Sequence, residues 1–506
     1  MRARRRARAM GAANRATSRA GLWRRLRLAA LVLGAMAVAL LGLRTYDSQR
    51  GPPLELWHSF IPPELDVAAL DQADWPAWMA AEQRAFDAVR TEVTEKLEPK
   101  DRDPVNRYFA GSAIHPPGFA QDFNRSYVLL PEVPLAGAVV LLHGLTDSPY
   151  SLRHIGLRYR AHGFAVVAIR LPGHGTVPAG LTDVAFEDWL AATRLAMREA
   201  RRLAGADRPV HLVGFSNGGA LAMKHALDAI EDPALPKAER IVLLSPMVGI
   251  TAFARFAGLA GLPALLPRFA KAAWLAVLPE FNPFKYNSFP VNGARQSWRA
   301  TQALQGQIDR LAEDGRLAQL PPILTFQSVM DFTVSTRAII DQLYARLPAN
   351  GSELVLIDLN RNAKLGPLLR PSSENVLERL LPPPPRRFRT TIIANEAPGF
   401  STVVARVTEA GATSEQVLDL GLSYPADVFS LSHVALPFPT WDALYGAEPN
   451  EPLDFGIQLG AVAARGERGA LIVNLDALLR MSSNPFYPYV QDRIEQLLGQ
   501  PAVATR

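Results

Sequence analysis

The sequence contains no cysteine, and its first 27 residues contain no acidic side chain. The first absence excludes disulfide bonds, thiolate metal sites and cysteine-linked lipids. The second leaves ten arginines unopposed at positions 1–27, so the formal net charge of +6 divides into +10 there and −4 over the rest. The main part of the chain is therefore slightly acidic, and its charge gives no support for nucleic-acid binding.

Charged residues are also missing from positions 28–43, an apolar run that follows the basic segment. With the flanking Leu26 and Arg27, this run is long enough to cross the hydrocarbon core of a bilayer. A cleaved secretory signal and a buried helix are the alternatives to an uncleaved anchor. The lack of a small-residue cleavage site after Leu43 favours the anchor over the signal. The arginine excess predicts a cytoplasmic tail over 1–27 and a periplasmic or other extracytoplasmic location for the rest of the chain.

Beyond this segment the composition is that of a folded protein, because 48% of all residues are hydrophobic and 20% are charged. Uniformly apolar runs alternate with stretches of helical periodicity. This alternation predicts an α/β fold in which a mostly parallel sheet is flanked by helices on both faces. The expected strands are 126–130, 138–142, 164–169, 210–213, 240–244 and 322–327.

The same patterns suggest how the chain is organised around that sheet. Residues 44–125 are expected to form a leader whose helix packs on the core, and 126–250 together with 314–506 to form the α/β core. Residues 251–313 are rich in Phe, Leu, Trp and Pro and are predicted to form a helical cap insertion. Residues 360–419 are interpreted as a lengthened excursion before the last strand of the sheet.

The segment Gly214-Phe215-Ser216-Asn217-Gly218 fits the pattern G-x-S-x-G. It follows an apolar strand and precedes a helical pattern, which is the context of a nucleophile elbow. A serine held clear of its neighbours on such a sharp turn needs small residues two positions before and after it, and Gly214 and Gly218 meet that need. The sequence therefore predicts Ser216 as a nucleophile.

A serine of this kind needs a histidine to accept its proton and a carboxylate to hold the histidine in the correct tautomer. In proteins with this elbow the chain order is serine, acid, histidine. Beyond His225, which lies on the helix after the elbow, the only histidine is His433. We therefore expect His433 to be the base.

Asp331 is the preferred candidate for the acid, because it follows the strand predicted at 322–327 and a strand end can present a carboxylate on a short turn. Asp341 and Asp358 are the alternatives. Asp358 could simply close its own apolar strand, and Asp341 has the pattern of a solvated helix face.

Negative charge that develops on a substrate carbonyl oxygen requires two backbone N–H donors. We expect one from Asn217, the residue after the nucleophile, and the other from Leu145, which follows the first apolar strand in His143-Gly144-Leu145. Gly144 would let the main chain approach closely at this loop. The pattern contains no metal-ligand cluster, and no cofactor is expected.

Five motifs in order resemble the monoglyceride lipase, lysophospholipase and carboxylesterase branch of the α/β-hydrolases, which also includes serine aminopeptidases: His143-Gly144-Leu145, Arg170-Leu171-Pro172-Gly173-His174-Gly175, Gly214-Phe215-Ser216-Asn217-Gly218, Asp331-Phe332-Thr333-Val334 and Ser432-His433-Val434. The resemblance covers about residues 128–436 and implies the α/β-hydrolase fold with a Ser216–His433–Asp331 triad. It does not specify the substrate. The gap between Asp331 and His433 is wider than this group usually has.

These observations predict a membrane-anchored serine hydrolase that cleaves carboxylic esters through an acyl-enzyme on Ser216. The apolar cap and the tether favour lipid-like substrates such as monoacylglycerols, lysophospholipids or short acyl esters. One alternative is a serine aminopeptidase, for which Glu280 and Asn282 are the nearby polar candidates. Another is a non-catalytic scaffold with the same fold. The partners expected are a small or lipid ester and the membrane, with no nucleic acid and no prediction of oligomeric state.

Overall fold

The computed structural model describes residues 2–249, 261–362, 376–460, 480 and 482–499. The chain divides into two compact units. One consists of Met1–Pro53 with Leu259–Trp274, and the other of Leu54–Gly258 with Leu275–Arg506. The second unit contains the sheet and every residue of the predicted site.

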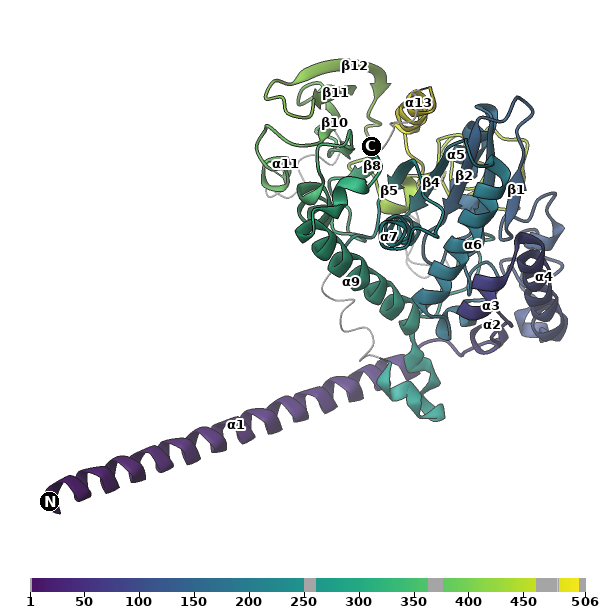
Figure 1. Ribbon diagram of the computed structural model, residues 1–506. Coiled ribbons are helices and arrows are strands. Elements are labelled where there is room, and N and C mark those ends of the chain that lie inside the picture. The colour runs from purple at the N-terminus through teal and green to yellow at the C-terminus, as the bar shows by residue number, and fades with distance from the viewer. Residues whose placement is uncertain (1, 250–260, 363–375, 461–479, 481, 500–506) are drawn as a thin grey trace. The chain divides into compact units, whose positions relative to one another are not determined.

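The smaller unit is built on the long helix α1 (Arg2–Arg50) (Figure 1). Its part Leu26–Arg50 is, by length and composition, able to cross a membrane, as an anchor or a signal sequence would be. Two 3-10 turns, Leu262–Leu265 and Pro267–Ala273, belong to the same unit. The Lys271 ammonium donates a hydrogen bond to the Gly51 carbonyl oxygen at 2.9 Å, so these turns are fastened at the C-terminal end of α1.

The larger unit contains a ten-stranded sheet with the order β1-β3-β2-β4-β5-β8-β9-β10-β11-β12. The strands from β3 to β10 in this order run parallel, while β1, β11 and β12 pair antiparallel to their neighbours. The predicted mostly parallel sheet is therefore confirmed. The strands are β1 (Tyr127–Leu129), β2 (Gly137–Leu142), β3 (Phe164–Ile169), β4 (Val210–Phe215), β5 (Arg240–Leu244), β8 (Ile323–Ser328), β9 (Glu353–Ile357), β10 (Arg389–Asn395), β11 (Thr402–Thr408) and β12 (Gln416–Ser423); β6 (Trp274–Ala276) and β7 (Phe289–Pro290) form a separate pair.

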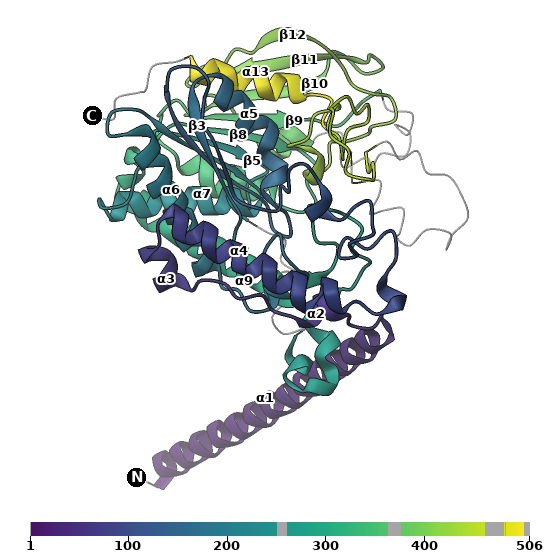
Figure 2. The same cartoon turned by 90° about the vertical axis from the view of Figure 1, so that its right-hand side faces the viewer.

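Helices cover both faces of the sheet, as Figures 1 and 2 show for this unit. Alternate side chains of β2 enter two different apolar clusters: Val140 packs on the side of α6 (Phe186–Ala204) and α7 (Asn217–Glu231), and Val139 on the side of α5 (Arg153–Ala161) and α13 (Tyr487–Leu498). Because both faces are covered, the central strands are apolar throughout rather than alternating. The predicted helical flanks are confirmed.

Within the larger unit, residues 54–125 of the leader pack on the sheet domain through three helices, α2 (Leu56–Ser59), α3 (Val67–Gln72) and α4 (Trp75–Glu92). Trp78 of α4 is fully buried, and its indole N–H donates to the Ser126 hydroxyl at 2.9 Å. Glu82, one turn later, accepts a hydrogen bond from the buried Arg170 at 3.0 Å. A buried tryptophan and an ion pair thus fasten the leader to the segments before β1 and after β3.

The predicted helical cap at 251–313 has to be corrected over its second half. Residues 291–313 form a single helix, α9 (Val291–Glu313), whose Leu304, Ile308 and Leu311 enter the main apolar cluster with side chains of α6 and α7. A helix with this buried face is a core element rather than a cap. Residues 251–260 of the prediction lie outside the described residues.

The predicted excursion at 360–419 is also different. Strand β10 continues the parallel part of the sheet beside β9, and β11 and β12 extend it further. Only α11 (Val376–Leu380) and short connections lie outside the sheet among the described residues of this stretch, and 363–375 are not described. The stretch therefore lengthens the sheet instead of bypassing it. Among the described residues, the remaining α-helix is the short α10 (Thr336–Ala338).

Candidate active site

Ser216 stands at the turn between β4 and α7. Its backbone has φ 52° and ψ −113°, a conformation that a residue other than glycine keeps only where the surrounding structure enforces it. A Cβ atom on Gly214 would lie 2.4 Å from the Gly218 carbonyl oxygen, and one on Gly218 would lie 1.9 Å from that of Leu142. Both positions therefore require glycine, and the turn presents the Ser216 hydroxyl at the carboxyl end of the strands.

The structure brings His433 and Asp331 to this serine. The His433 Nε2 atom lies 3.0 Å from the Ser216 hydroxyl oxygen, and its Nδ1 atom lies 2.7 Å from a carboxylate oxygen of Asp331. His433 begins a 3-10 turn (His433–Ala435) that follows β12, and Asp331 lies on the turn after β8. The Ser216 and His433 side chains are buried, which keeps this chain of hydrogen bonds away from bulk water.

The carboxylate of Asp331 is held by the backbone of its own turn. One oxygen accepts hydrogen bonds from the N–H groups of Thr333 and Val334 at 2.8 and 3.0 Å. Burial alone would raise the pKa of Asp331, but attraction to His433 and these hydrogen bonds lower it below its ordinary value. Asp331 is therefore ionised near neutral pH, as a group that orients a histidine must be.

The two alternative acids lie elsewhere. Asp341 is exposed and has Arg337 as its ion-pair partner at 3.8 Å. Asp358 is buried at the end of β9, where its carboxylate contacts Arg361 at 3.4 Å. Neither makes a hydrogen bond or an ion pair with His433 in the described part of the chain, so only Asp331 has the geometry of an orienting acid.

Leu145 and Asn217, the expected oxyanion donors, belong to two loops that meet at Ser216. Asn217 is the first residue of α7, so its backbone N–H has no carbonyl partner within the helix and lies at the positive end of the helix dipole. Leu145 follows β2, which is the direct neighbour of β4 in the sheet. A Cβ atom on Gly144 would come within 3.2 Å of the Phe215 ring, so glycine lets the two loops approach each other.

Two nearby histidines support the loops instead of joining this group. The His143 Nε2 atom accepts a hydrogen bond from the Leu171 N–H at 3.0 Å, while its Nδ1 atom contacts the Gly144 carbonyl oxygen at 2.9 Å. His174 contacts the Pro172 carbonyl oxygen at 3.1 Å, and burial lowers its pKa to about 3. Both rings are therefore neutral and structural near pH 7.

A cavity of about 250 Å³ lies beside Ser216 and His433. Phe215 and Val434, the direct neighbours of Ser216 and His433 in sequence, line it. Most of the remaining wall is apolar, but three charged side chains also reach it: Asp147, Lys285 and Arg480. A larger cavity of about 320 Å³ lies against α4, and none of its lining residues belongs to the group around Ser216.

Residues 139–358 match the profile of the Alpha/beta hydrolase family. This part of the chain belongs to the α/β-hydrolase family. The match spans β2 to the end of β9, so it includes Ser216 and Asp331 but ends before His433.

Among known relatives, the chain is 27% identical over 174 residues to a "Thermostable monoacylglycerol lipase" of Bacillus sp. (strain H-257). The aligned stretch covers 34% of this chain and 65% of that protein, so the chain spans slightly less than two thirds of the relative's length. Two solved structures are also similar. A soluble variant of monoglyceride lipase from Saccharomyces cerevisiae has 14% identity and a TM-score of 0.34, covering 46% of this chain and 80% of that chain. A monoacylglycerol lipase from Paleococcus ferrophilus has 17% identity and a TM-score of 0.34, covering 51% and 98%.

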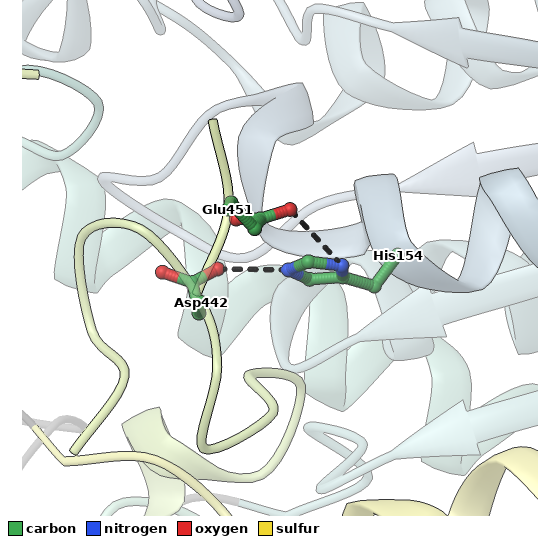
Figure 3. A group of neighbouring side chains, drawn as sticks. All are labelled: His154, Asp442 and Glu451. Atoms are coloured by element: carbon green, nitrogen blue, oxygen red, sulfur yellow. Dashed lines mark hydrogen bonds and ion pairs between the residues drawn. The ribbon is translucent and has the colours of Figure 1, made fainter. Parts of the chain in front are cut away.

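A second buried group of ionisable side chains was not predicted from the sequence. His154, Asp442 and Glu451 lie close enough together to contact a common ion (Figure 3). However, the Arg153 guanidinium lies 2.5 Å from the Asp442 carboxylate and also pairs with Glu451. The charge of Arg153 already offsets the charge of these two carboxylates, and the Tyr150 hydroxyl donates to the other Asp442 oxygen at 2.9 Å.

This group, which we call the Asp442 cluster, consists of Tyr150, Arg153, His154, Asp442 and Glu451. It fastens the segment that follows His433 to α5 and to the turn before it. Burial would raise the pKa of Asp442, but Arg153 and His154 hold it well below its usual range. Because 289 positions separate Arg153 from Asp442, no local sequence pattern could have indicated the pair.

Proposed function

We propose that the chain is a serine hydrolase that cleaves carboxylic esters through an acyl-enzyme on Ser216. The observation that carries this proposal is the hydrogen-bonded series Ser216–His433–Asp331, at 3.0 and 2.7 Å, on a strained elbow of an α/β-hydrolase domain. A side-chain hydroxyl is a weak nucleophile without a neighbouring base, and this arrangement provides one.

In this mechanism His433 takes the hydroxyl proton as Ser216 Oγ bonds to the ester carbonyl carbon. The Nδ1–H of His433 donates to Asp331, which stabilises the imidazolium ion. The backbone N–H groups of Leu145 and Asn217 donate to the oxyanion of the tetrahedral intermediate. His433 then gives its proton to the departing alcohol oxygen, and a water molecule repeats the sequence to release the acid and restore Ser216.

A lipid-like ester is the substrate class that the cavity supports best. Leu278, Phe281 and Phe438 supply apolar wall beside the reacting group, and such a wall favours an acyl chain. The monoacylglycerol lipase relative supports the same class. The proposed steps of ester cleavage need neither a metal nor an organic cofactor.

The apolar helix Leu26–Arg50 supports a membrane anchor as part of this proposal. The basic segment before it would remain on the cytoplasmic side, and the hydrolase domain would work on the opposite side of the membrane. An enzyme tethered to a bilayer would meet amphiphilic esters at the surface where they concentrate.

The peptidase alternative has little support from the side chains on which it depended. Glu280 is buried and accepts hydrogen bonds from the N–H groups of Asn287 and Ser288 at 3.0 and 2.8 Å. The Asn282 amide donates to the Tyr445 hydroxyl at 2.6 Å. Both are occupied within the protein, which leaves neither free to receive a substrate amine.

The proposal is tested by comparing the hydrolysis of p-nitrophenyl esters and 1-monoacylglycerols with that of aminoacyl naphthylamides. We expect turnover of the esters and little turnover of the amides, with both abolished in Ser216→Ala. Turnover of amides above that of esters would favour the peptidase, and no turnover by a folded wild-type protein would favour the non-catalytic scaffold.

A further inference from the structure

The wall of the cavity beside Ser216 carries an excess of positive charge. Lys285 and Arg480 are its cations, and Asp147 is its one carboxylate. A cavity that took only neutral esters would have no use for charged side chains, because each must be desolvated when the substrate enters. Their presence therefore calls for an explanation in terms of the substrate.

Lys285 is held rigidly in position by the backbone on either side of it. The N–H of Tyr286 donates to the Thr146 carbonyl oxygen at 2.8 Å, which ties Lys285 to the loop that carries Leu145. On the other side, Phe284 stacks on Tyr150 with ring centroids 4.3 Å apart. The backbone that carries Lys285 is therefore already ordered, so it loses little further entropy when a ligand binds.

The ammonium group of Lys285 is not used by an ion pair in the described part of the chain. The charge of Asp147, which lines the same cavity, favours the charged form of Lys285. The Asp147 carboxylate itself accepts a hydrogen bond from the Ser148 N–H at 3.0 Å. Burial lowers the pKa of Lys285, as expected for a cation that has lost water without gaining a close partner. An anion in the cavity would supply that partner.

Arg480 is fixed beside the reacting groups in a similar way. Its guanidinium donates to the Thr333 hydroxyl at 2.8 Å, and its carbonyl oxygen accepts a hydrogen bond from the Ser432 hydroxyl at 2.9 Å. Thr333 is on the turn of Asp331, and Ser432 directly precedes His433. Arg480 thus links the loops of the two residues that serve Ser216 and adds a second cation at the same cavity.

We infer that Lys285 and Arg480 form a subsite for an anionic group, a phosphate or a carboxylate, on the ester that Ser216 attacks. This inference rests on the proposed esterase function and names its substrate as an anionic amphiphile. The apolar wall takes the acyl chain, and the two cations pair with the anion through charge-assisted hydrogen bonds. The anion lies either on the departing alcohol, as in a lysophospholipid, or at the far end of the acyl group.

The test uses two pairs of substrates that differ only in the anion. The first pair is 1-oleoylglycerol and 1-oleoylglycerol 3-phosphate, and the second is p-nitrophenyl hexanoate and the p-nitrophenyl monoester of adipic acid. For the full-length wild type, we expect kcat/KM to be about 10-fold or more higher for the anionic member of at least one pair. A preference in the first pair assigns the anion to the alcohol, and one in the second pair assigns it to the acyl group.

Three variants test whether the preference for the anionic substrate depends on Lys285. Lys285→Gln should lower the anionic-to-neutral ratio of kcat/KM by about 10- to 100-fold, while Lys285→Arg should keep it within about 3-fold. Lys237→Gln, which removes an exposed lysine from another part of the domain, is the matched control and should leave the ratio unchanged. A Lys285→Gln variant that lowers kcat/KM equally for both members of a pair would overturn the inference.

A measurement on the wild type alone covers the case in which Lys285→Gln does not fold. Dodecyl phosphate and dodecanol are compared as inhibitors of p-nitrophenyl hexanoate hydrolysis, and the phosphate should bind about 10-fold more tightly or better. Equal inhibition constants, or equal kcat/KM values within both substrate pairs, would refute the subsite while leaving the esterase function intact. Failure to hydrolyse any of the four esters would refute the proposed function itself.

Discussion

His433 lies 2.7 Å from Asp331 although 102 positions separate them in the sequence. Four strands, β9 to β12, lie in this interval, so the chain leaves the carboxyl end of β8, extends the sheet, and returns beside the turn of Asp331. The wide interval therefore reflects a longer sheet and leaves the geometry of the two side chains unaffected.

Replacement of the orienting acid should impair the chemical step without unfolding the protein. In Asp331→Asn the amide would favour the wrong tautomer of His433, so we expect kcat to fall by about 10³- to 10⁴-fold. Asp341→Asn, which alters the exposed aspartate beside Arg337, is the control and should retain kcat within about 2-fold. Steady-state kinetics on a p-nitrophenyl ester measures both. Near-normal kcat in Asp331→Asn would contradict the assignment of the acid.

The elbow should not accept a side chain at Gly218. A Cβ atom there would meet the Leu142 carbonyl oxygen at 1.9 Å, and the backbone would have to shift, so Gly218→Ala should cost about 3 kcal/mol of unfolding free energy. Gly306→Ala on the exposed face of α9 meets nothing within 4 Å and should stabilise the protein by about 0.5 to 1 kcal/mol. Urea unfolding followed by circular dichroism compares the two. Equal effects would show that the elbow is less tightly packed than described.

The Asp442 cluster should stabilise the protein in a pH-dependent way. Asp442→Asn removes one of the two carboxylates that pair with the buried Arg153, and we expect a loss of about 3 to 5 kcal/mol of unfolding free energy at pH 7. Because the folded state lowers the pKa of Asp442, the contribution is complete above its unfolded value of about 4 and is lost as the pH falls through the folded value.

Urea unfolding at pH 7 and at pH 3 measures this difference between wild type and variant. The difference should be smaller at pH 3. Asp207→Asn, on an exposed loop, is the control and should change the unfolding free energy by less than about 0.5 kcal/mol at either pH. If Asp442→Asn had the same unfolding free energy as the wild type at pH 7, a fastening role for the cluster would be contradicted.

The N-terminal helix should attach the protein to membranes. We expect the full-length chain to remain in the membrane pellet after an alkaline carbonate wash, and its intact mass to include residues 1–53. A truncated chain that begins at Leu54 should be found in the supernatant and hydrolyse a water-soluble ester within about 3-fold of the full-length rate, because the larger unit holds the whole site. A mature protein that lacks the first residues would instead identify a cleaved signal.

The fold and the reacting groups were predictable from the sequence to different extents. Uniformly apolar strands reveal a parallel sheet, and the glycines around Ser216 reveal a turn that admits no Cβ. His433 could be found because it is the only histidine after the helix of the elbow. Each of these signals is local or depends on a single rare residue.

Other features depend on contacts that no local pattern encodes. Helix α9 was expected in a cap because its surroundings are apolar, but its buried stripe of Leu304, Ile308 and Leu311 packs on α6 and α7. Strand β12 is largely exposed at the edge of the sheet, so its residues lack the apolar run that identified the central strands. Arg153 and Asp442 pair with each other in the interior of the protein. Charged residues are usually exposed to solvent, so the sequence alone gives no sign that these two are buried.

The most direct test of the central claim is labelling with a fluorophosphonate, which forms a covalent bond only with an activated serine. The full-length wild type should be labelled at a single peptide that contains Ser216, and His433→Ala and Ser216→Ala should abolish labelling while remaining folded by circular dichroism. A folded wild-type protein that is not labelled, or that is labelled at another serine, would contradict the account.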